Sequence, residues 1–284
     1  MLRAAVVAVA LAGLSIPAQV QAQTCTRDHL KTFIANYFKA VETHSMAALP
    51  TAPNLRITEN GAEVKPGEGF VKTGGKATIL RSLLDTERCG TVTQALVDET
   101  VNGVTELTIV AVRLKVESGK VTEIEALLGR KGASKMAGFD FYDPKALLAT
   151  KDHDWEVPLP AGARQTRAYM NEHANRYFSS FATNPQGPDA NYATPCHRWE
   201  GGLQTTVKNP SCSPRGTGLV MNHTHRRFPV TDTETGATAG FILFGGGLPD
   251  VHMFKFDKDG KIYLIQAVFA GRVGPDTQIW PDEK

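Results

Sequence analysis

The chain has 284 residues, with 31 basic and 29 acidic side chains and a formal net charge of +2 at pH 7. A balance this close to neutral argues against a polybasic face of the kind that binds nucleic acid or anionic lipid. The length is sufficient for one large domain or for two domains of ordinary size.

The first 22 residues, MLRAAVVAVALAGLSIPAQVQA, have the features of a secretory signal peptide. Arg3 is their one charged residue, the apolar run is short for a membrane span, and Val-Gln-Ala ends at Ala22. We expect cleavage before Gln23. An uncleaved membrane anchor is the less favoured alternative, because no basic stop-transfer segment follows. We therefore predict a secreted, extracellular protein with no membrane partner.

All four cysteines lie after the predicted cleavage site, at Cys25, Cys89, Cys196 and Cys212. An even count in an oxidising compartment favours disulfides. Four cysteines allow three connectivities, and the sequence alone does not choose among them. With two domains, the economical choice is Cys25 with Cys89 and Cys196 with Cys212.

The region after the cleavage site alternates helical and strand patterns. Residues 27–42, RDHLKTFIANYFKAVE, predict an amphipathic helix, and 55-LRITENG-61 predicts a strand. Residues 76–86 predict a further short helix from their leucine and isoleucine spacing. Residues 110–116 alternate in the manner of a half-buried strand, and a hairpin turn is expected at 117–120.

Residues 138–162 are expected to form a linker between a first domain, 23–137, and a second domain, 163–284. The linker contains Pro144 and Trp155. A buried tryptophan contributes a large apolar area. We therefore favour Trp155 as an anchor that packs onto one of the domains, with a ligand-stacking role as the alternative.

The second half of the chain repeats the first. Residues 164–181 predict another amphipathic helix, and Tyr177-Phe178 lies 140 positions after Tyr37-Phe38. A second hairpin turn is expected at 257–260, with Gly260 lying 141 positions after Gly119. With a shift of one indel, 55-LRITENG-61 aligns with 197-HRWEGG-202, which pairs Arg56 with Arg198 and Glu59 with Glu200. Three segments with nearly the same spacing indicate a tandem duplication.

Each predicted unit resembles the cone-shaped ketosteroid isomerase-like fold, also called SnoaL-like or nuclear transport factor-like. The chain also resembles secreted fungal proteins of unknown function that carry two such units. The resemblance rests on Asn36-Tyr37-Phe38, Arg176-Tyr177-Phe178, the two aligned strands, 227-RFPVTDTETG-236 and the two terminal hairpins. It implies an α+β fold of two tandem, cone-shaped, curved antiparallel sheets, each wrapped on an N-terminal helix. Because that fold hosts several enzyme classes and plain binding modules, it constrains function weakly.

Several strong catalytic signatures are absent from the sequence. There is no G-x-S-x-G, no H-E-x-x-H and no C-x-x-C, and in 69-GFVKTGGKAT-78 the Gly75-Lys76 pair precedes Ala77, where a phosphate loop requires Ser or Thr. These absences disfavour serine hydrolases, zinc proteases and nucleotide-binding proteins. We predict no cofactor and no metal.

His252 is the sharpest candidate for catalysis. Strand alternation sets it on one face with Phe254 and Phe256, and Val112 occupies the equivalent position in the first copy. In an apolar pocket, desolvation would lower the pKa of His252 and leave a neutral base. The alternative is a buried histidine bonded to a backbone carbonyl.

A second concentration of polar residues follows at 222–232. Asn222 begins an Asn-His-Thr sequon, which predicts glycosylation at the surface. His223 and His225 would share one face of a strand, but no third ligand is in view for zinc. Asp232 is a candidate general base, the role an aspartate plays in ketosteroid isomerase. The favoured alternative is that Asp232 opens the turn that follows.

Four further residues are candidates for binding a ligand. Arg198 and Glu200 face the same side of a strand and can pair, either to orient a ligand carboxylate or carbonyl or, as we favour, in a structural role common to both copies. Tyr177 offers a phenol to a developing oxyanion, or is simply a core aromatic residue. Arg227 is the fourth candidate.

These residues together predict a secreted, cofactor-independent enzyme that uses acid–base chemistry on a small organic molecule, as an isomerase, dehydratase or lyase. His252 and Asp232 would be catalytic, in a pocket of the second domain. The alternatives are a non-catalytic secreted protein that binds a small ligand, and a secreted hydrolase. The partner is expected to be a small molecule, and the two domains could pack as a pseudo-dimer.

Overall fold

The computed structural model describes residues 25–136, 139–150, 153, 155–208, 210–245, 247–271 and 280. The predicted signal peptide, residues 1–22, lies outside the described residues. None of the described helices has the length and apolar character needed to span a membrane.

The first unit runs from helix α1 to strand β6. Helix α1 (Arg27–Thr43) begins at the N-cap Thr26, whose side chain accepts a hydrogen bond from the His29 backbone N–H. A short 3-10 turn, η1 (Met46–Ala48), leads into the sheet. The remaining elements are β1 (Thr51–Glu59), β2 (Ala62–Glu63), α2 (Phe70–Thr73), β3 (Gly74–Asp85), β4 (Gly90–Val101), β5 (Val104–Glu117) and β6 (Lys120–Gly129).

The second unit runs from helix α4 to strand β14. Between the units lie β7 (Lys135–Met136), β8 (Phe139–Asp140), α3 (Pro144–Leu148) and η2 (Ala161–Ala163). The second unit contains α4 (Arg167–Ser179), β9 (Tyr192–Glu200), β10 (Leu203–Gln204), β11 (Thr224–Asp232), β12 (Ala237–Phe244), β13 (Leu248–Phe256) and β14 (Ile262–Phe269). Its sheet has the order β10-β9-β14-β13-β12-β11, which repeats the order β2-β1-β6-β5-β4-β3 of the first sheet. This is the relation that a tandem duplication predicts.

Both six-stranded sheets are mixed, so the expectation of antiparallel sheets needs correction. Strand β1 runs parallel to β6, and β9 runs parallel to β14, while the other neighbours are antiparallel. Strands joined by hairpins must be antiparallel, but β1 and β9 reach their neighbours without a hairpin. Their direction is therefore not set by a turn.

Residues 76–86 belong almost entirely to strand β3, so the predicted short helix is wrong. The helical spacing arose because β3 is apolar on both faces: Leu83 packs between the two sheets, and Leu84 packs under α1. A strand that is buried on both sides loses its alternation and cannot be distinguished from a helix by periodicity. Strand β5 is likewise buried on both faces rather than half-buried.

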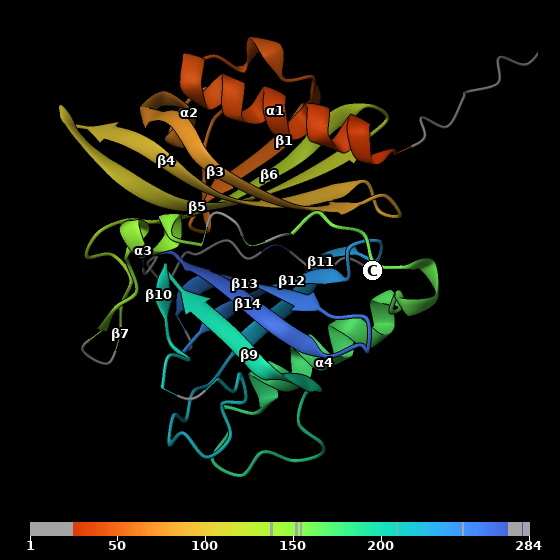
Figure 1. The fold of residues 1–284 in the computed structure, drawn as a ribbon. Helices are drawn as coiled ribbons and strands as arrows, with labels where there is room; N and C mark the ends of the chain where they lie inside the picture. Colours follow the sequence, from red (N-terminus) through yellow and green to blue (C-terminus); the bar gives the residue numbers. More distant parts are fainter. Residues whose placement is uncertain are drawn as a thin grey trace, which may run out of the picture.

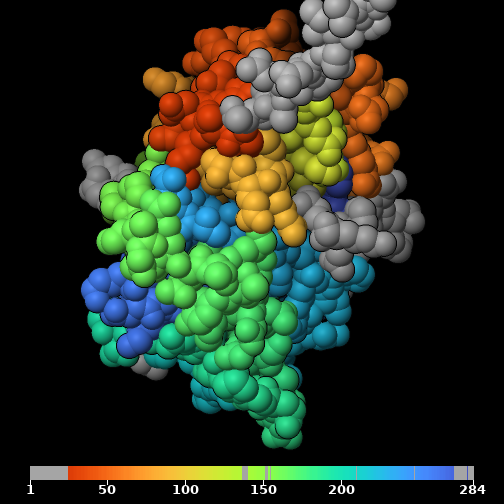
Figure 2. Space-filling view, turned by 90° about the vertical axis from the view of Figure 1, so that its right-hand side faces the viewer, coloured from red at the N-terminus to blue at the C-terminus, as the bar shows by residue number. Residues whose placement is uncertain are grey.

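The molecule consists of four layers, with the two sheets in the middle (Figure 1). Helix α1 packs on the outer face of the first sheet, and α4 packs on the outer face of the second. A third apolar cluster fills the space between the sheets and includes Trp155, which is 2% exposed. The predicted anchor role of Trp155 is thus confirmed. Figure 2 shows the first unit, in red to yellow, stacked on the second, in green to blue.

Two ion pairs cross between the units with approximate two-fold symmetry. Arg27, the first residue of α1, lies 2.8 Å from Asp232, and Arg167, the first residue of α4, lies 2.8 Å from Asp85. Each aspartate also accepts a hydrogen bond from the backbone N–H that precedes the other aspartate, at 3.1 Å from Leu84 and 3.0 Å from Thr231. Equivalent residues of the two units therefore make equivalent contacts across the space between them.

The two disulfides are Cys25–Cys89 and Cys196–Cys212, the economical pairing considered above. Each one joins residues of a single unit. The first ties the start of α1 to the turn between β3 and β4, and the second ties β9 to the segment between β10 and β11.

Candidate functional site

A group of polar side chains lies inside the second unit, between its sheet and α4. Strand alternation directs Arg198 and Glu200 of β9, and Asp250 and His252 of β13, to the face that α4 covers. Tyr177 of α4 meets them from the other side. We refer to these five residues as the polar cluster. Their neighbours on this face are apolar and include Phe178, Phe254, Phe256 and Phe269.

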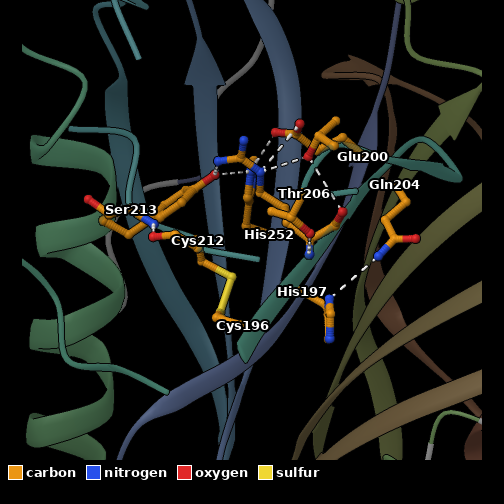
Figure 3. Close-up of a disulfide and its surroundings, with 12 residues drawn as sticks. Cys196, His197, Glu200, Gln204, Thr206, Cys212, Ser213 and His252 are labelled. Atoms are coloured by element: carbon orange, nitrogen blue, oxygen red, sulfur yellow. Dashed lines mark hydrogen bonds and ion pairs between the residues drawn. A yellow bond between two sulfur atoms is a disulfide. The ribbon is translucent and has the colours of Figure 1, made fainter. Parts of the chain in front are cut away.

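The imidazole of His252 is the centre of the polar cluster. Its Nδ1 atom lies 2.9 Å from Asp250 Oδ2, and its Nε2 atom lies 3.4 Å from Tyr177 Oη and 3.9 Å from Glu200 Oε1. Arg198 donates from Nη1 to Tyr177 Oη at 3.0 Å, and its Nε lies 3.5 Å from Glu200 Oε2. The phenol oxygen therefore stands between a guanidinium and an imidazole. Figure 3 shows His252 and Glu200 side by side.

Burial decides the protonation states of this group. It raises the pKa of Asp250 well above 3.8, and the nearby Glu200 adds to the rise. It lowers the pKa of His252 to about 3, although Glu200 opposes the change. It also raises the pKa of Tyr177. At neutral pH the cluster therefore holds a neutral imidazole and a protonated phenol, and burial favours the protonated form of the Asp250 carboxyl group.

The contact between Asp250 and His252 is close but poorly aligned. The two carboxyl oxygens of Asp250 make no hydrogen bond of good geometry with any of the described residues. The same is true of His252 Nδ1. A buried polar group without such a bond costs free energy, so these atoms are poised for a further partner or a small rearrangement. At 2.9 Å, Asp250 is a close polar neighbour of His252 Nδ1 without a well-aligned hydrogen bond.

The polar cluster is sealed from solvent. The side chains of His252 and Tyr177 are 0% exposed, and aromatic rings surround the imidazole, with Phe178 and Phe269 at 5.2 and 5.8 Å between ring centroids. The disulfide Cys196–Cys212 is fully buried at the edge of this core (Figure 3). A ligand can therefore reach His252 only when the surrounding chain opens.

His223 supplies a second buried imidazole next to the polar cluster. Its ring stacks on Phe244 at 4.4 Å, and Phe244 in turn stacks on His252 at 6.1 Å. Burial lowers the pKa of His223 to about 3, and His252 contributes to the decrease. Neither ring nitrogen of His223 has a hydrogen-bond partner among the described residues.

The pairing of His223 with His225 on one strand face is wrong. His225 is exposed and has a φ of 53°, so a local irregularity in β11 turns it away from the buried His223. Within the described ranges, no group of three or more His, Cys, Asp or Glu side chains could hold a metal ion. Asn222 is exposed, as the glycosylation prediction requires.

Asp232 does not join the polar cluster. It lies at the contact between the units, where it pairs with Arg27 and accepts a hydrogen bond from the Leu84 backbone. It also accepts a hydrogen bond from the Thr235 backbone N–H at 3.2 Å, which is the turn role considered as its alternative. The predicted role of Asp232 as general base therefore has no support in the geometry.

Arg227 also lies away from the polar cluster, between the units. Its guanidinium contacts Glu125 of the first unit and lies 5.1 Å from the centre of the Phe241 ring. The contact with Glu125 crosses from one sheet to the other. The geometry thus gives Arg227 a role in packing the units rather than in binding a ligand at His252.

Strand register corrects the predicted Arg–Glu repeat. Glu59 pairs with Ala126 and Glu200 with Ala267, so the two glutamates are equivalent. Two residues earlier in each strand, however, the counterpart of Arg198 is Ile57. Arg56 points elsewhere and lies over the ring of Trp280, at 4.1 Å. The pairing of Arg198 with Glu200 therefore has no equivalent at the matching positions of the first unit, and a structural role common to both units is wrong.

Asp250 is the member of the polar cluster that the sequence prediction missed. The available signal was its position two residues before His252 on the same strand, which places both side chains on one face. His223 was noticed only as a potential metal ligand. It lies just before β11 and is buried, and no periodic pattern in the sequence marks that burial.

Comparison with known proteins gives a partial match. Residues 163–269, which contain the whole polar cluster, match a family model described as a domain of unknown function, DUF8021. No curated protein matches the chain. A crystal structure from Xanthomonas campestris, described as a protein of unknown function with a cystatin-like fold, is 13% identical over 36% of this chain and 92% of its own. Its TM-score of 0.28 is too low to carry an argument about function.

Proposed function

We propose that the protein is a secreted, cofactor-independent enzyme that moves protons on a small organic molecule, as an isomerase, dehydratase or lyase. The observation that carries this proposal is the position of a neutral His252 between the carboxyl group of Asp250 and the phenol of Tyr177. A neutral imidazole is a base, and a base near an apolar surface is suited to removing a proton from carbon or oxygen.

Each residue of the polar cluster has a role in such a reaction. His252 Nε2 accepts the proton, Asp250 at Nδ1 orients the imidazole, and the nearby Glu200 stabilises the imidazolium that forms. Tyr177 donates a hydrogen bond to the oxygen on which negative charge develops. Arg198, which donates to Tyr177 Oη, makes the phenol a stronger donor, and Glu200 balances the charge of Arg198.

The wider features of the chain support this proposal by analogy. A helix packed on a six-stranded sheet resembles the ketosteroid isomerase-like, or SnoaL-like, fold, which hosts isomerases and dehydratases. The predicted signal peptide, the two disulfides and the sequon at Asn222 support a secreted glycoprotein.

A non-catalytic protein that binds a small ligand is the second candidate. It is favoured by one observation, the complete enclosure of His252 by aromatic rings. A pocket that closes on an aromatic or aliphatic ligand would present the same walls.

The two candidates are separated by hydrogen–deuterium exchange on a panel of small ketones, hydroxy acids and phenols in D2O, followed by NMR. We expect one or more compounds to exchange a C–H proton or to be converted. His252→Gln should lower that rate by about 100-fold or more, which is the usual contribution of a general base. Tyr177→Phe should lower it less.

Val112→Ala is the matched control, since Val112 occupies the register position of His252 in the first unit. It should leave the rate unchanged. Equal rates in wild type and folded His252→Gln would exclude the proposed base. Binding without exchange or conversion by the wild type would favour the second candidate.

A further inference from the structure

A cavity of about 500 Å³ opens at one end of the first unit, remote in sequence from the polar cluster. It is bounded by the end of β1, by α2, by the hairpin between β4 and β5, and by the residues that follow β6. A volume of this size falls within the range of small-molecule sites. All of its lining residues belong to the first unit, so what it binds does not depend on the proposed reaction at His252.

The two basic residues of this cavity are already neutralised. Arg130 donates to both oxygens of Glu99, at 2.7 and 2.8 Å, and Lys131 lies 3.2 Å from Glu106. Glu99 also accepts hydrogen bonds from Thr73 and Thr108. Burial alone would raise the pKa of Glu99, but Arg130 and the two hydroxyls lower it. Glu99 is therefore a charged residue whose bonding capacity is filled.

Glu59 is the remaining carboxyl group of the cavity, and no basic side chain among the described residues pairs with it. Its Oε1 accepts a hydrogen bond from the Phe70 backbone N–H, and its carboxyl group lies directly on Gly69. Gly69 has a φ of 59°, which favours glycine, and a Cβ atom there would displace the Glu59 carboxyl group. Burial raises the pKa of Glu59, and Glu99 adds to the rise, although the Phe70 backbone N–H and the charge of Arg130 oppose it. A positive charge brought into the cavity would relieve this imbalance.

The opposite wall of the cavity is apolar and exposed. Val101 and Val104 line it, and their side chains are 44% and 62% exposed. These valines flank the turn between β4 and β5, where no other part of the described chain covers them. A ligand with an apolar portion would remove this surface from water.

We propose that the cavity binds a small primary amine with an aliphatic portion. The ammonium group pairs with the Glu59 carboxylate, and the aliphatic portion lies on Val101 and Val104. A carboxylate ligand is disfavoured because the cavity carries an excess of negative charge once Arg130 and Lys131 are paired.

The test measures binding of pentylamine, pentanol and pentanoate to the full-length secreted protein at pH 7, by calorimetry and by NMR chemical shifts. Pentylamine is expected to bind more tightly than either of the other two by about tenfold, the value of one charge-assisted hydrogen bond. Glu59→Gln should weaken pentylamine binding by a similar factor and leave pentanol binding unchanged.

Glu106→Gln is the matched control, because it removes the same charge from the rim of the same cavity. It should change pentylamine binding by less than Glu59→Gln does. Val104→Ser, at an exposed position that tolerates the change, should weaken pentylamine more than methylamine, and this variant keeps the test valid if Glu59→Gln fails to fold. The proposal is overturned if pentylamine does not bind, if pentanoate binds equally well, or if both glutamine variants weaken the amine equally.

Discussion

The two units differ at three positions on the sheet face that the helix covers. By strand register, Ile57, Val110 and Val112 in the first unit correspond to Arg198, Asp250 and His252 in the second. The glutamate on the neighbouring strand and the helical tyrosine are present in both units. One scaffold therefore encloses an apolar core in the first unit and a polar group in the second. The first unit instead keeps a cavity open at its end.

Ile57, Val110 and Val112 show that this scaffold folds with apolar side chains at these three positions. Burying charged and polar groups costs free energy unless every bond is satisfied, and Asp250 and His252 are not fully satisfied. Stability alone therefore does not account for the residues of the second unit. The difference is consistent with the chemical role proposed for the polar cluster.

Removing the disulfides should have the largest effect on stability, and the effect should differ between the units. Cys25–Cys89 closes 64 residues and Cys196–Cys212 closes 16. On the chain-entropy model, losing the first costs about 4 kcal/mol of unfolding free energy and losing the second about 3 kcal/mol. Paired Cys→Ser variants followed by urea unfolding would measure both. A greater loss from the shorter loop would mean that the second disulfide stabilises the folded polar cluster directly.

The two ion pairs between the units should contribute equally to the unfolding free energy if their geometric symmetry is matched by equal interaction energies. Asp85→Ala and Asp232→Ala should each lower the unfolding free energy by about 3 kcal/mol, because each leaves an arginine and a backbone N–H without a buried partner. Urea unfolding at pH 7 measures the effect. Lys31→Ala, which removes an exposed pair with Glu156, is the control and should cost less than about 1 kcal/mol. Markedly unequal losses from the two aspartates would show that the units do not hold each other symmetrically.

These ion pairs also show where sequence-based prediction stops. The helices at 27–42 and 164–181 and both hairpin turns were predictable because their signals are local. Asp232 was misassigned because its partner, Arg27, lies 205 positions away, and no local sequence pattern predicts the contact. The face of His252 followed from alternation, but the closeness of Tyr177 depends on how α4 crosses the sheet. Strand β3 was missed because one of its faces packs under α1 and the other against the second sheet, so that its apolar residues do not alternate with polar ones.

Giving the second unit the residues of the first should leave stability intact. The double variant Asp250→Val/His252→Val should match the wild type or exceed it by about 1 to 3 kcal/mol, because an apolar core replaces imperfectly bonded polar groups. Asp250→Val alone should be less stable than the double variant, since it leaves His252 Nδ1 buried without a partner. Thermal and urea unfolding of the three proteins measure this. A double variant clearly less stable than wild type would make the polar cluster structural and would weaken the enzymatic proposal.

Sensitivity of the fold to acid should arise in the second unit. Each buried imidazole should lower the unfolding free energy by up to about 1.4 kcal/mol per pH unit as the pH falls. The buried histidines of the described chain, His173, His223 and His252, all lie there. Because burial lowers the pKa of His223 to about 3, its ring stays neutral in the folded protein but takes up a proton on unfolding below about pH 6.5. The unfolded state then binds more protons, so the unfolding free energy falls as the pH falls from 6.5 toward 3.

His223→Phe should therefore flatten the dependence of unfolding free energy on pH between 6 and 4, as measured by urea unfolding at several pH values. His225→Asn is the control, because His225 is exposed and asparagine tolerates its positive φ.

Amide exchange at pH 5 should increase first in the strands around His223 and His252 and later under α1. Asp250 has the opposite effect on the pH dependence, because its raised pKa makes the unfolding free energy fall as the pH rises. The unfolding free energy should therefore be greatest below the pH at which the Asp250 carboxyl group ionises in the folded protein. Earlier acid opening of the first unit would show that the apolar unit, rather than the polar one, limits the stability of the molecule.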